Sequence, residues 1–206
     1  MAGYTDHWQG VYTRKAPDQV SWYRAHLDQS LAAIDALRLP PLAGIIDVGG
    51  GAATLVDDLV ARGFTNVTVL DIAEASLNTA KQRLGARAAL VHWLAQDITR
   101  AELPAQAYDF WHDRAVFHFL TDPQDRARYV AAVRRSVRPG GHVLVATFGP
   151  EGPQQCSGLD VCRYDADRLH DQFGPDFERI DALTEVHATP WGSQQQFVYC
   201  LCRVSA

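Results

Sequence analysis

The residues best suited to chemistry lie in one short stretch, in which an aspartate precedes three consecutive glycines. Asp47 follows two isoleucines and is followed by Val48 and Gly49–Gly51. Glycine permits backbone angles that other residues avoid, and it leaves no side chain between the backbone and a ligand. About twenty residues further on, Asp71 ends a second apolar run, where an acid suits the two hydroxyls of an adenosine ribose. The spacing predicts a nucleoside-binding site.

The charges around this turn discriminate between two kinds of nucleoside cofactor. The third glycine of a dinucleotide fingerprint would fall where the chain has Thr54, and residues 39–61 contain aspartates but no lysine or arginine. A pyrophosphate would find backbone N–H groups here without a cation. S-adenosylmethionine carries an ammonium and a sulfonium and no phosphate, so we expect S-adenosylmethionine as the cofactor. NAD(P) is the alternative, because a helix N-terminus can hold phosphate unaided.

The elements that must position these groups alternate between strands and helices. The predicted strands are about 43–48, 66–71, 88–94, 107–112 and 142–148, and the predicted helices between them are about 52–62, 74–84 and 123–137. A turn at 138–141 ends the last helix. Such alternation is typical of a parallel sheet with helices on both faces.

The end of the chain departs from this alternation. Residues 177–189 and 195–204 read as two strands with no helix between them, which predicts an antiparallel hairpin at one edge of the sheet. The expected fold is therefore α/β, with a Rossmann-like, doubly wound and mostly parallel seven-stranded sheet closed by the C-terminal hairpin. We expect one domain over 1–206, in which 1–40 form an N-terminal helical cap and 41–206 form the Rossmann-like core.

The composition narrows the class of protein. The chain has 206 residues with 47% hydrophobic and 21% charged side chains, enough for one sizeable core. The net charge of -5 disfavours nucleic acid as a partner. The first ten residues hold no signal-peptide core, and no apolar run approaches the roughly 20 residues of a membrane span. We expect a cytoplasmic protein without a membrane partner, with its four cysteines as reduced thiols and with no metal site.

The N-terminus is unusually aromatic. Trp8 and Tyr12 lie four positions apart on one stripe of a helix, and Trp22 follows after Pro17. These rings can simply face the core. They can also form a lid, because the negative face of a ring can cover an adenosine or contact a sulfonium. The two interpretations are compatible, and the sequence leaves both open.

Together these features resemble the class I S-adenosylmethionine-dependent methyltransferases. The resemblance covers about residues 40–206 and rests on the Asp47–Gly51 turn, on Asp71, on Asp97–Ile98 and on the Arg138–Gly141 turn. It implies the methyl donor as cofactor, with a cofactor loop, a ribose acid and an adenine contact. The implied cofactor-binding residues of the core are Asp47, Gly49, Gly51, Asp71, Ile72, Asp97 and Ile98.

The N-terminus is similar to a subgroup that includes protein-lysine methyltransferases acting on elongation factor and citrate synthase. The similarity implies that Trp8, Tyr12, Trp22 and the basic Arg114 also contact the cofactor. Those lysine enzymes carry an acid–lysine–glycine run after the fourth strand, whereas this chain has His112–Ala115. This departure favours a small bacterial-type member of the family over a lysine-modifying one.

Methyl transfer needs no fixed catalytic signature, because the cofactor supplies the leaving group and the protein supplies alignment. The catalytic residues are therefore unassigned. Ligands of such sheets sit beyond the carboxyl ends of the strands, so the loops after the fourth and fifth strands should meet the acceptor. They offer His118, Cys156, Arg163 and Tyr164 as substrate-binding residues, of which His118, Cys156 and Tyr164 are catalytic candidates. His118 can also be a packed core histidine, and Cys156 an ordinary loop cysteine.

The charges of these loops indicate the kind of acceptor. The loops after the fourth and fifth strands carry a neutral-to-basic set of side chains, namely His112, Arg114, His118, Cys156 and Arg163. Such a set suits an anionic or soft small molecule better than a cationic lysine. We expect a methyltransferase acting on a small thiol, metalloid or carboxylate. The alternatives are a protein-lysine methyltransferase, an NAD(P)-dependent oxidoreductase and a non-catalytic nucleoside-binding module.

Overall fold

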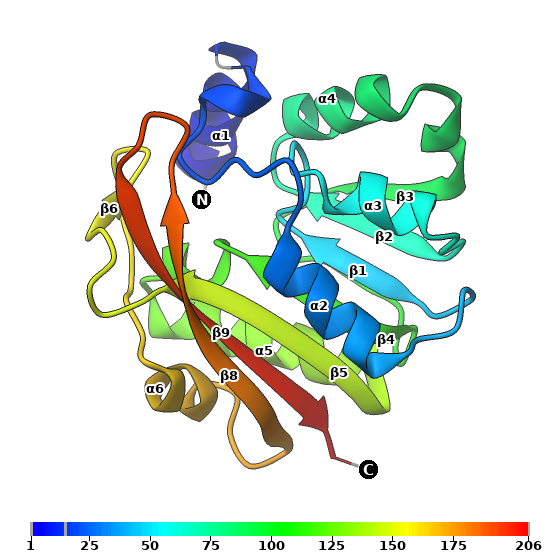
Figure 1. Ribbon diagram of the computed structural model, residues 1–206. Coiled ribbons are helices and arrows are strands. Elements are labelled where there is room, and N and C mark those ends of the chain that lie inside the picture. The colour runs from blue at the N-terminus through cyan, green and yellow to red at the C-terminus, as the bar shows by residue number, and fades with distance from the viewer. Residues whose placement is uncertain (1, 15, 206) are drawn as a thin grey trace.

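A seven-stranded sheet runs through the molecule in the order β3-β2-β1-β4-β5-β9-β8 (Figure 1). The computed structural model describes residues 2–14 and 16–205, and residues 1, 15 and 206 of the predicted domain lie outside this range. The five parallel strands are β1 (Ile45–Val48), β2 (Val67–Asp71), β3 (Val91–Ala95), β4 (Tyr108–Arg114) and β5 (Val137–Phe148). The two antiparallel strands are β8 (Phe177–Ala188) and β9 (Gln194–Val204). The predicted Rossmann-like sheet with its closing hairpin is confirmed.

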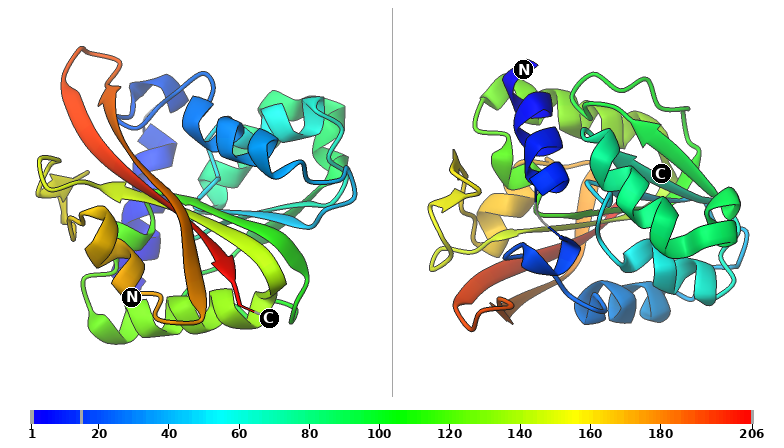
Figure 2. Two further views of the ribbon diagram at one scale, coloured as in Figure 1. Left: turned by 60° about the horizontal axis from the view of Figure 1, so that its bottom comes forward. Right: turned by 90° about the horizontal axis from the view of Figure 1, so that it is seen from above.

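Helices cover both faces of this sheet, because the strands of its centre are apolar on both sides (Figure 2). One face packs against α2 (Asp28–Leu37), α3 (Leu55–Ala61) and α4 (Glu74–Leu84). The other face packs against α5 (Pro123–Ser136) and α6 (Ala166–Asp171). The predicted start of α5 is confirmed, since Asp122 accepts a hydrogen bond from the backbone N–H of Gln124 and Pro123 takes the first position.

Three predicted boundaries are wrong, of which the first is the start of α3, at Leu55 and not near residue 52. Residues 88–90 are not part of a strand but belong to a 3₁₀ turn, η2 (Gly85–Leu90). The first residue of β2, Val67, pairs with Val91, so residues 88–90 have no residue of β2 beside them.

Residues 138–141 are expected from the sequence to form a turn between the helix and the fifth strand, but they belong to β5, which begins at Val137. The ladder with β4 pairs Tyr108 with Val137 and then Phe110 with His142. Residues 138–141 therefore form an irregularity between these two pairs, which Gly140 permits with φ +77°.

The loop after β5 holds structure that the sequence pattern did not indicate. Residues 155–160 form a small antiparallel hairpin of β6 (Gln155–Cys156) and β7 (Leu159–Asp160). Ser157 and Gly158 form its turn with φ +51° and +78°. This hairpin brings Cys156 back toward the carboxyl ends of the parallel strands, where the side chain is buried.

The N-terminal segment is the last structural layer. Helix α1 (Ala2–Arg14) lies against α4, and a 3₁₀ turn, η1 (Pro17–Gln19), leads to a stretch beside the β8–β9 hairpin (Figure 1). His187 of β8 contacts the backbone oxygen of Ser21 at 2.6 Å, and Arg24 forms an ion pair with Glu185. These contacts join the N-terminal stretch to the C-terminal hairpin. Among the described residues, no helix is both long and apolar enough to cross a membrane.

Candidate active site

A cavity of about 360 Å³ opens at the carboxyl ends of the parallel strands. The turns after β1, β2, β3 and β4 form its floor, and residues of α1 and of the stretch after it form its cover. The predicted site residues that line it are Trp8, Tyr12, Trp22, Asp47, Gly49, Asp71, Ile72, Asp97, Ile98, Arg114 and Cys156. Gly51 lies directly behind the wall, where its N–H donates to Asp71 at 3.1 Å. Four separate turns and the N-terminus thus converge on one cavity.

Asp47 presents one unpaired oxygen to this cavity. Its carboxylate is 2% exposed, and Oδ1 accepts a hydrogen bond of 2.7 Å from Nδ1 of His112. The other nitrogen of His112 lies 2.8 Å from the hydroxyl of Ser30 on α2, so the imidazole is fixed at both ends. Oδ2 of Asp47 is buried without a hydrogen-bond partner in the protein. Because an unpaired buried acceptor is costly, this oxygen suits a cationic ligand group.

Arg114 presents the opposite charge from the end of β4. Its Nε donates to the hydroxyl of Tyr199 at 3.0 Å, and its Nη1 donates to the backbone oxygen of Trp22 at 3.0 Å. The guanidinium carbon lies 4.3 Å from the ring centre of Phe197. Nη2 is buried and has no acceptor in the protein. A free guanidinium N–H is well matched to a carboxylate, so the cavity offers one partner for each charge of an amino-acid zwitterion.

Asp71 is held by the backbone of two turns. It is 4% exposed, and its two oxygens accept hydrogen bonds from the N–H groups of Ala73 at 2.8 Å and Gly51 at 3.1 Å. Burial raises the pKa of Asp71 to about 6, although its hydrogen bonds to Ala73, Ser76 and Gly51 lower it in part. The carboxylate is therefore mostly ionised at neutral pH. Each of its oxygens has a second lone pair for a ribose hydroxyl.

The glycines of the first turn serve the packing of the site itself. Gly49 has φ +71°, and a Cβ there would collide with Val116 in the turn after β4. A Cβ at Gly51 would collide with Ser76 and with Asp71. The glycines therefore allow three turns to approach one another, which lets the N–H of Gly51 reach the carboxylate of Asp71.

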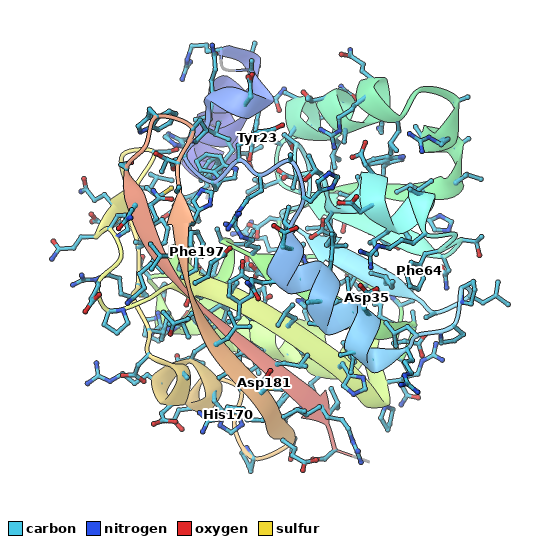
Figure 3. The ribbon with its side chains drawn as sticks, in the orientation of Figure 1. Tyr23, Asp35, Phe64, His170, Asp181 and Phe197 are labelled. Carbon is cyan, nitrogen blue, oxygen red and sulfur yellow. The ribbon has the colours of Figure 1, made fainter. Side chains whose placement is uncertain are left out.

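Aromatic rings form the cover of the cavity. The ring of Trp8 lies 6.1 Å from that of Tyr12, 5.8 Å from that of Trp22 and 5.0 Å from that of Phe119. All four residues line the cavity, and Tyr23, beside α1 in Figure 3, lines it too. Burial, and then Asp71 and Cys156, raise the pKa of Tyr12 well above its usual value. The rings pack on one another and also face the cavity, as both sequence interpretations allow.

The structure places three predicted substrate-binding residues, His118, Arg163 and Tyr164, away from the cavity. His118 is fully buried, and its Nδ1 accepts a hydrogen bond of 3.1 Å from the N–H of Phe148. Burial, and then Arg114, lower the pKa of His118 to about 3. It is thus a packed core histidine, and its position does not support a role as base.

Arg163 and Tyr164 are engaged elsewhere in the loop after β5. Nη1 of Arg163 donates to the backbone oxygens of Pro150 at 2.8 Å and Gly152 at 3.1 Å. Tyr164 is 7% exposed, and its ring lies 5.9 Å from that of Phe117 on the opposite side of the sheet from α2. Burial raises the pKa of Tyr164. The loop folds back on itself, which its sequence did not indicate.

The charge of the cavity also differs from the predicted neutral-to-basic set. Its lining holds two arginines, Arg24 and Arg114, and Arg24 is paired with Glu185. The carboxylates of the lining are those of Asp47, Asp71, Asp97, Asp122 and Asp125. The expectation was wrong because it counted loop residues that do not reach the cavity. Among the described residues, no cluster of three or more His, Cys, Asp or Glu side chains has the arrangement of a metal site.

Sequence reasoning named Asp113 only as an acceptor-side candidate or a partner of Arg114, and it missed the supporting role of this residue. Asp113 is fully buried and accepts hydrogen bonds from the N–H of Val116 at 2.8 Å and the hydroxyl of Tyr129 at 2.7 Å. It thereby closes the turn in which Ala115, a lining residue, has φ +74°. Burial raises the pKa of Asp113 to about 6. Tyr199, which contacts Arg114, and Glu185, which contacts Tyr199, had no local signal in the sequence.

Known proteins resemble this chain in sequence and in fold. Residues 45–141 match the sequence profile of a methyltransferase domain family. The chain is 24% identical over 148 residues to the eEF1A lysine and N-terminal methyltransferase of Bos taurus, covering 69% of this chain and 21% of that protein. It is 29% identical over 110 residues to the malonyl-[acyl-carrier protein] O-methyltransferase of a Paenibacillus species, covering 52% and 39%. The chain thus spans well under half the length of both curated relatives.

A solved structure extends the likeness to nearly the whole chain. The N-methyltransferase NodS of Bradyrhizobium japonicum, in complex with S-adenosyl-L-homocysteine, superposes with a TM-score of 0.73. The superposition covers 98% of this chain and 99% of that one at 14% identity, so it concerns the fold. The matched domain begins at β1 and contains Asp47, Gly49–Gly51 and Asp71, which lie at or directly beside the cavity. Residues 45–141 of this chain are thus similar to a methyltransferase domain, and the superposed structure holds S-adenosyl-L-homocysteine.

Proposed function

We propose that this chain transfers a methyl group from S-adenosylmethionine to a small-molecule acceptor. The observation that carries the proposal is the pair of unpaired buried atoms at one cavity, Oδ2 of Asp47 and Nη2 of Arg114. They match the ammonium and the carboxylate of the methionine end of the cofactor. Asp71, with spare acceptor capacity, matches the ribose hydroxyls. Asp97 and Ile98 are then the residues beside the adenine.

The chain's own part in the reaction is to bind, to align and to exclude water. When bound, the cofactor supplies a methyl group on a positively charged sulfur. Asp47 and Arg114 would fix the amino-acid end, and Asp71 the ribose, so that the methyl faces the aromatic cover. The methyl would pass to a lone pair of the acceptor, and the carbon–sulfur electron pair would stay on sulfur. A proton on the acceptor leaves to water, and alignment supplies most of the rate.

The arginines of the site argue against an anionic acceptor. Arg24 is paired with Glu185, Arg163 is bonded to backbone oxygens, and the free nitrogen of Arg114 is needed for the cofactor. No described arginine or lysine of the lining is then left for a carboxylate or an oxyanion. Carboxylates and metalloid oxyanions therefore lose support. An uncharged nucleophile fits the aromatic cover and Cys156, and we propose a small thiol or amine.

A protein lysine is the second candidate acceptor. Asp122 and Asp125 lie on the cavity lining, and their charge would attract an ammonium group. The bovine relative is named as a lysine methyltransferase. The missing acid–lysine–glycine run after β4 speaks against this candidate, since the chain has His112–Ala115 there.

Transfer of labelled methyl groups into a cell extract separates these candidates. The full chain is incubated with methyl-labelled S-adenosylmethionine and extract, and label is measured in the small-molecule and protein fractions. We expect label among small molecules, less label with Asp71→Ala, and unchanged labelling with Asp181→Ala, which lies at the far end of the hairpin (Figure 3). Label on protein lysines would move the chain to the second candidate. Cofactor binding without any label would make it a non-catalytic module.

A further inference from the structure

The cofactor side of the cavity depends on the C-terminal hairpin through Arg114. Three neighbouring strands place Arg114 and Tyr199 in line, because Arg114 pairs with Ala146 of β5 and Ala146 pairs with Tyr199 of β9. The phenol oxygen of Tyr199 accepts from Nε of Arg114 at 3.0 Å, and Phe197, two residues earlier, puts its ring under the guanidinium at 4.3 Å. The hairpin therefore holds two sides of a side chain that would otherwise sample many rotamers.

Glu185 fixes the direction of this contact. It is 9% exposed, accepts the hydrogen bond of the Tyr199 hydroxyl at 2.8 Å and forms an ion pair with Arg24. Because the proton of Tyr199 is directed to Glu185, the lone pairs of its oxygen are left for Arg114. Burial raises the pKa of Tyr199 to about 12, so this proton is kept at neutral pH. The same carboxylate also holds the N-terminal stretch through Arg24.

The geometry leaves one guanidinium nitrogen for a ligand. Tyr199 takes Nε, the backbone oxygen of Trp22 takes Nη1, and Nη2 is buried without a partner at the cavity. We propose that Tyr199 and Glu185 are positioning residues, which orient Arg114 so that Nη2 meets the carboxylate of bound S-adenosylmethionine. This inference rests on the proposed function, since it presumes that the methionine end of the cofactor lies at Arg114.

Binding of two nucleosides separates positioning from general support of the fold. S-adenosylhomocysteine carries the amino-acid end, whereas 5′-methylthioadenosine lacks it and presents the same adenosine. Calorimetry of the full chain measures both affinities. We expect Tyr199→Phe to weaken S-adenosylhomocysteine about tenfold, the scale of one lost hydrogen bond to a charged group, and to leave methylthioadenosine within about twofold. Glu185→Gln should show the same selectivity with a smaller loss, and Arg114→Ala a larger one.

Tyr108→Phe is the matched control. Tyr108 is also a buried tyrosine of the sheet, at the start of β4 and outside the cavity lining, so both affinities should stay unchanged. Equal losses for both nucleosides in Tyr199→Phe would overturn the inference in favour of a structural role. Unchanged affinity for S-adenosylhomocysteine in Tyr199→Phe would also overturn it. If the unmodified protein bound neither nucleoside, the proposed function itself would fail.

Discussion

The two walls of the cavity are built in different ways. On the first wall, Asp71 is held by the backbone N–H group of Gly51 at 3.1 Å, and behind this wall Asp113 is held by that of Val116 at 2.8 Å. On the second wall, side chains meet across the whole chain, as Arg24 and Glu185 do over 161 positions. The first wall depends only on the formation of the parallel sheet and its turns. The second wall also requires the hairpin and the N-terminus to reach each other, so its geometry is the more easily lost.

The largest expected effect tests whether the contacts behind the first wall also stabilise the folded protein. Asp113→Ala removes the acceptor of two backbone N–H groups and of the Tyr129 hydroxyl, all in a buried turn. We expect a loss of about 3 kcal/mol in the free energy of unfolding, because buried donors without an acceptor are costly. Denaturant unfolding measures it. Glu178→Ala, on an exposed part of β8, is the control and should unfold as the unmodified protein does. A loss below about 0.5 kcal/mol would show that the turn does not need the carboxylate.

The next effect is on the ligand affinity of the first wall. Asp71→Ala removes the carboxylate that faces the ribose position, and we expect binding of S-adenosylhomocysteine to weaken by about 2 kcal/mol. Calorimetry gives the value. Asp71→Asn keeps one oxygen acceptor and should recover part of the lost affinity. If Asp71→Ala bound as tightly as the unmodified protein while Arg114→Ala did not bind, the second wall would carry the affinity, and the comparison would be reversed.

The pH dependence of the affinity for S-adenosylhomocysteine tests the same role of the Asp71 carboxylate. Since the pKa of Asp71 is raised to about 6, the carboxylate is protonated as the pH falls through that value and loses its acceptor role. We expect the affinity for S-adenosylhomocysteine to fall about tenfold from pH 7 to pH 5. The stability of the protein without ligand should depend on pH in the opposite direction. Because the pKa of Asp71 is about 6 in the folded state and 3.8 in the unfolded chain, the folded state binds the proton first. The contribution of Asp71 to the free energy of unfolding therefore rises as the pH falls from about 6 toward 3.8. A profile that is equally steep in Asp71→Asn would assign the titration to another group.

The smallest effect concerns the aromatic cover of the second wall. Trp22→Ala removes the ring that lies 5.8 Å from Trp8 and 6.4 Å from Tyr12 but keeps the backbone oxygen that Arg114 uses. We expect the affinity for S-adenosylmethionine to fall about fivefold, the scale of one ring contact with a cation. The 61% exposed Trp191 at the hairpin tip gives the control Trp191→Ala, which should bind normally. Normal binding by Trp22→Ala would make the ring a packing residue only.

The sequence alone determined the parallel sheet, the closing hairpin and the place of Asp47 and Asp71. These features depend on short-range patterns, namely apolar periodicity, glycine after a strand and an acid at a strand end, which a single sequence displays directly. The same patterns located Trp8 and Tyr12 on one stripe of α1. They did not reveal the β6–β7 hairpin, whose turn relies on the positive φ of Ser157, a residue type that does not indicate such a turn.

Only the tertiary structure decided which side chains meet at the cavity. His118 follows β4, which ends at the cavity, and Tyr164 follows the β6–β7 hairpin, yet both side chains are buried in the core, while Cys156 turns back to the lining. The contact of Tyr199 with Arg114 depends on the register of β9 against β5. A slip of one residue would turn Tyr199 to the other face of the sheet, and no local pattern in the chain fixes that register. Contacts of this kind are decided by how distant strands pair, which is why the sequence could name Arg114 but not the residues that hold it.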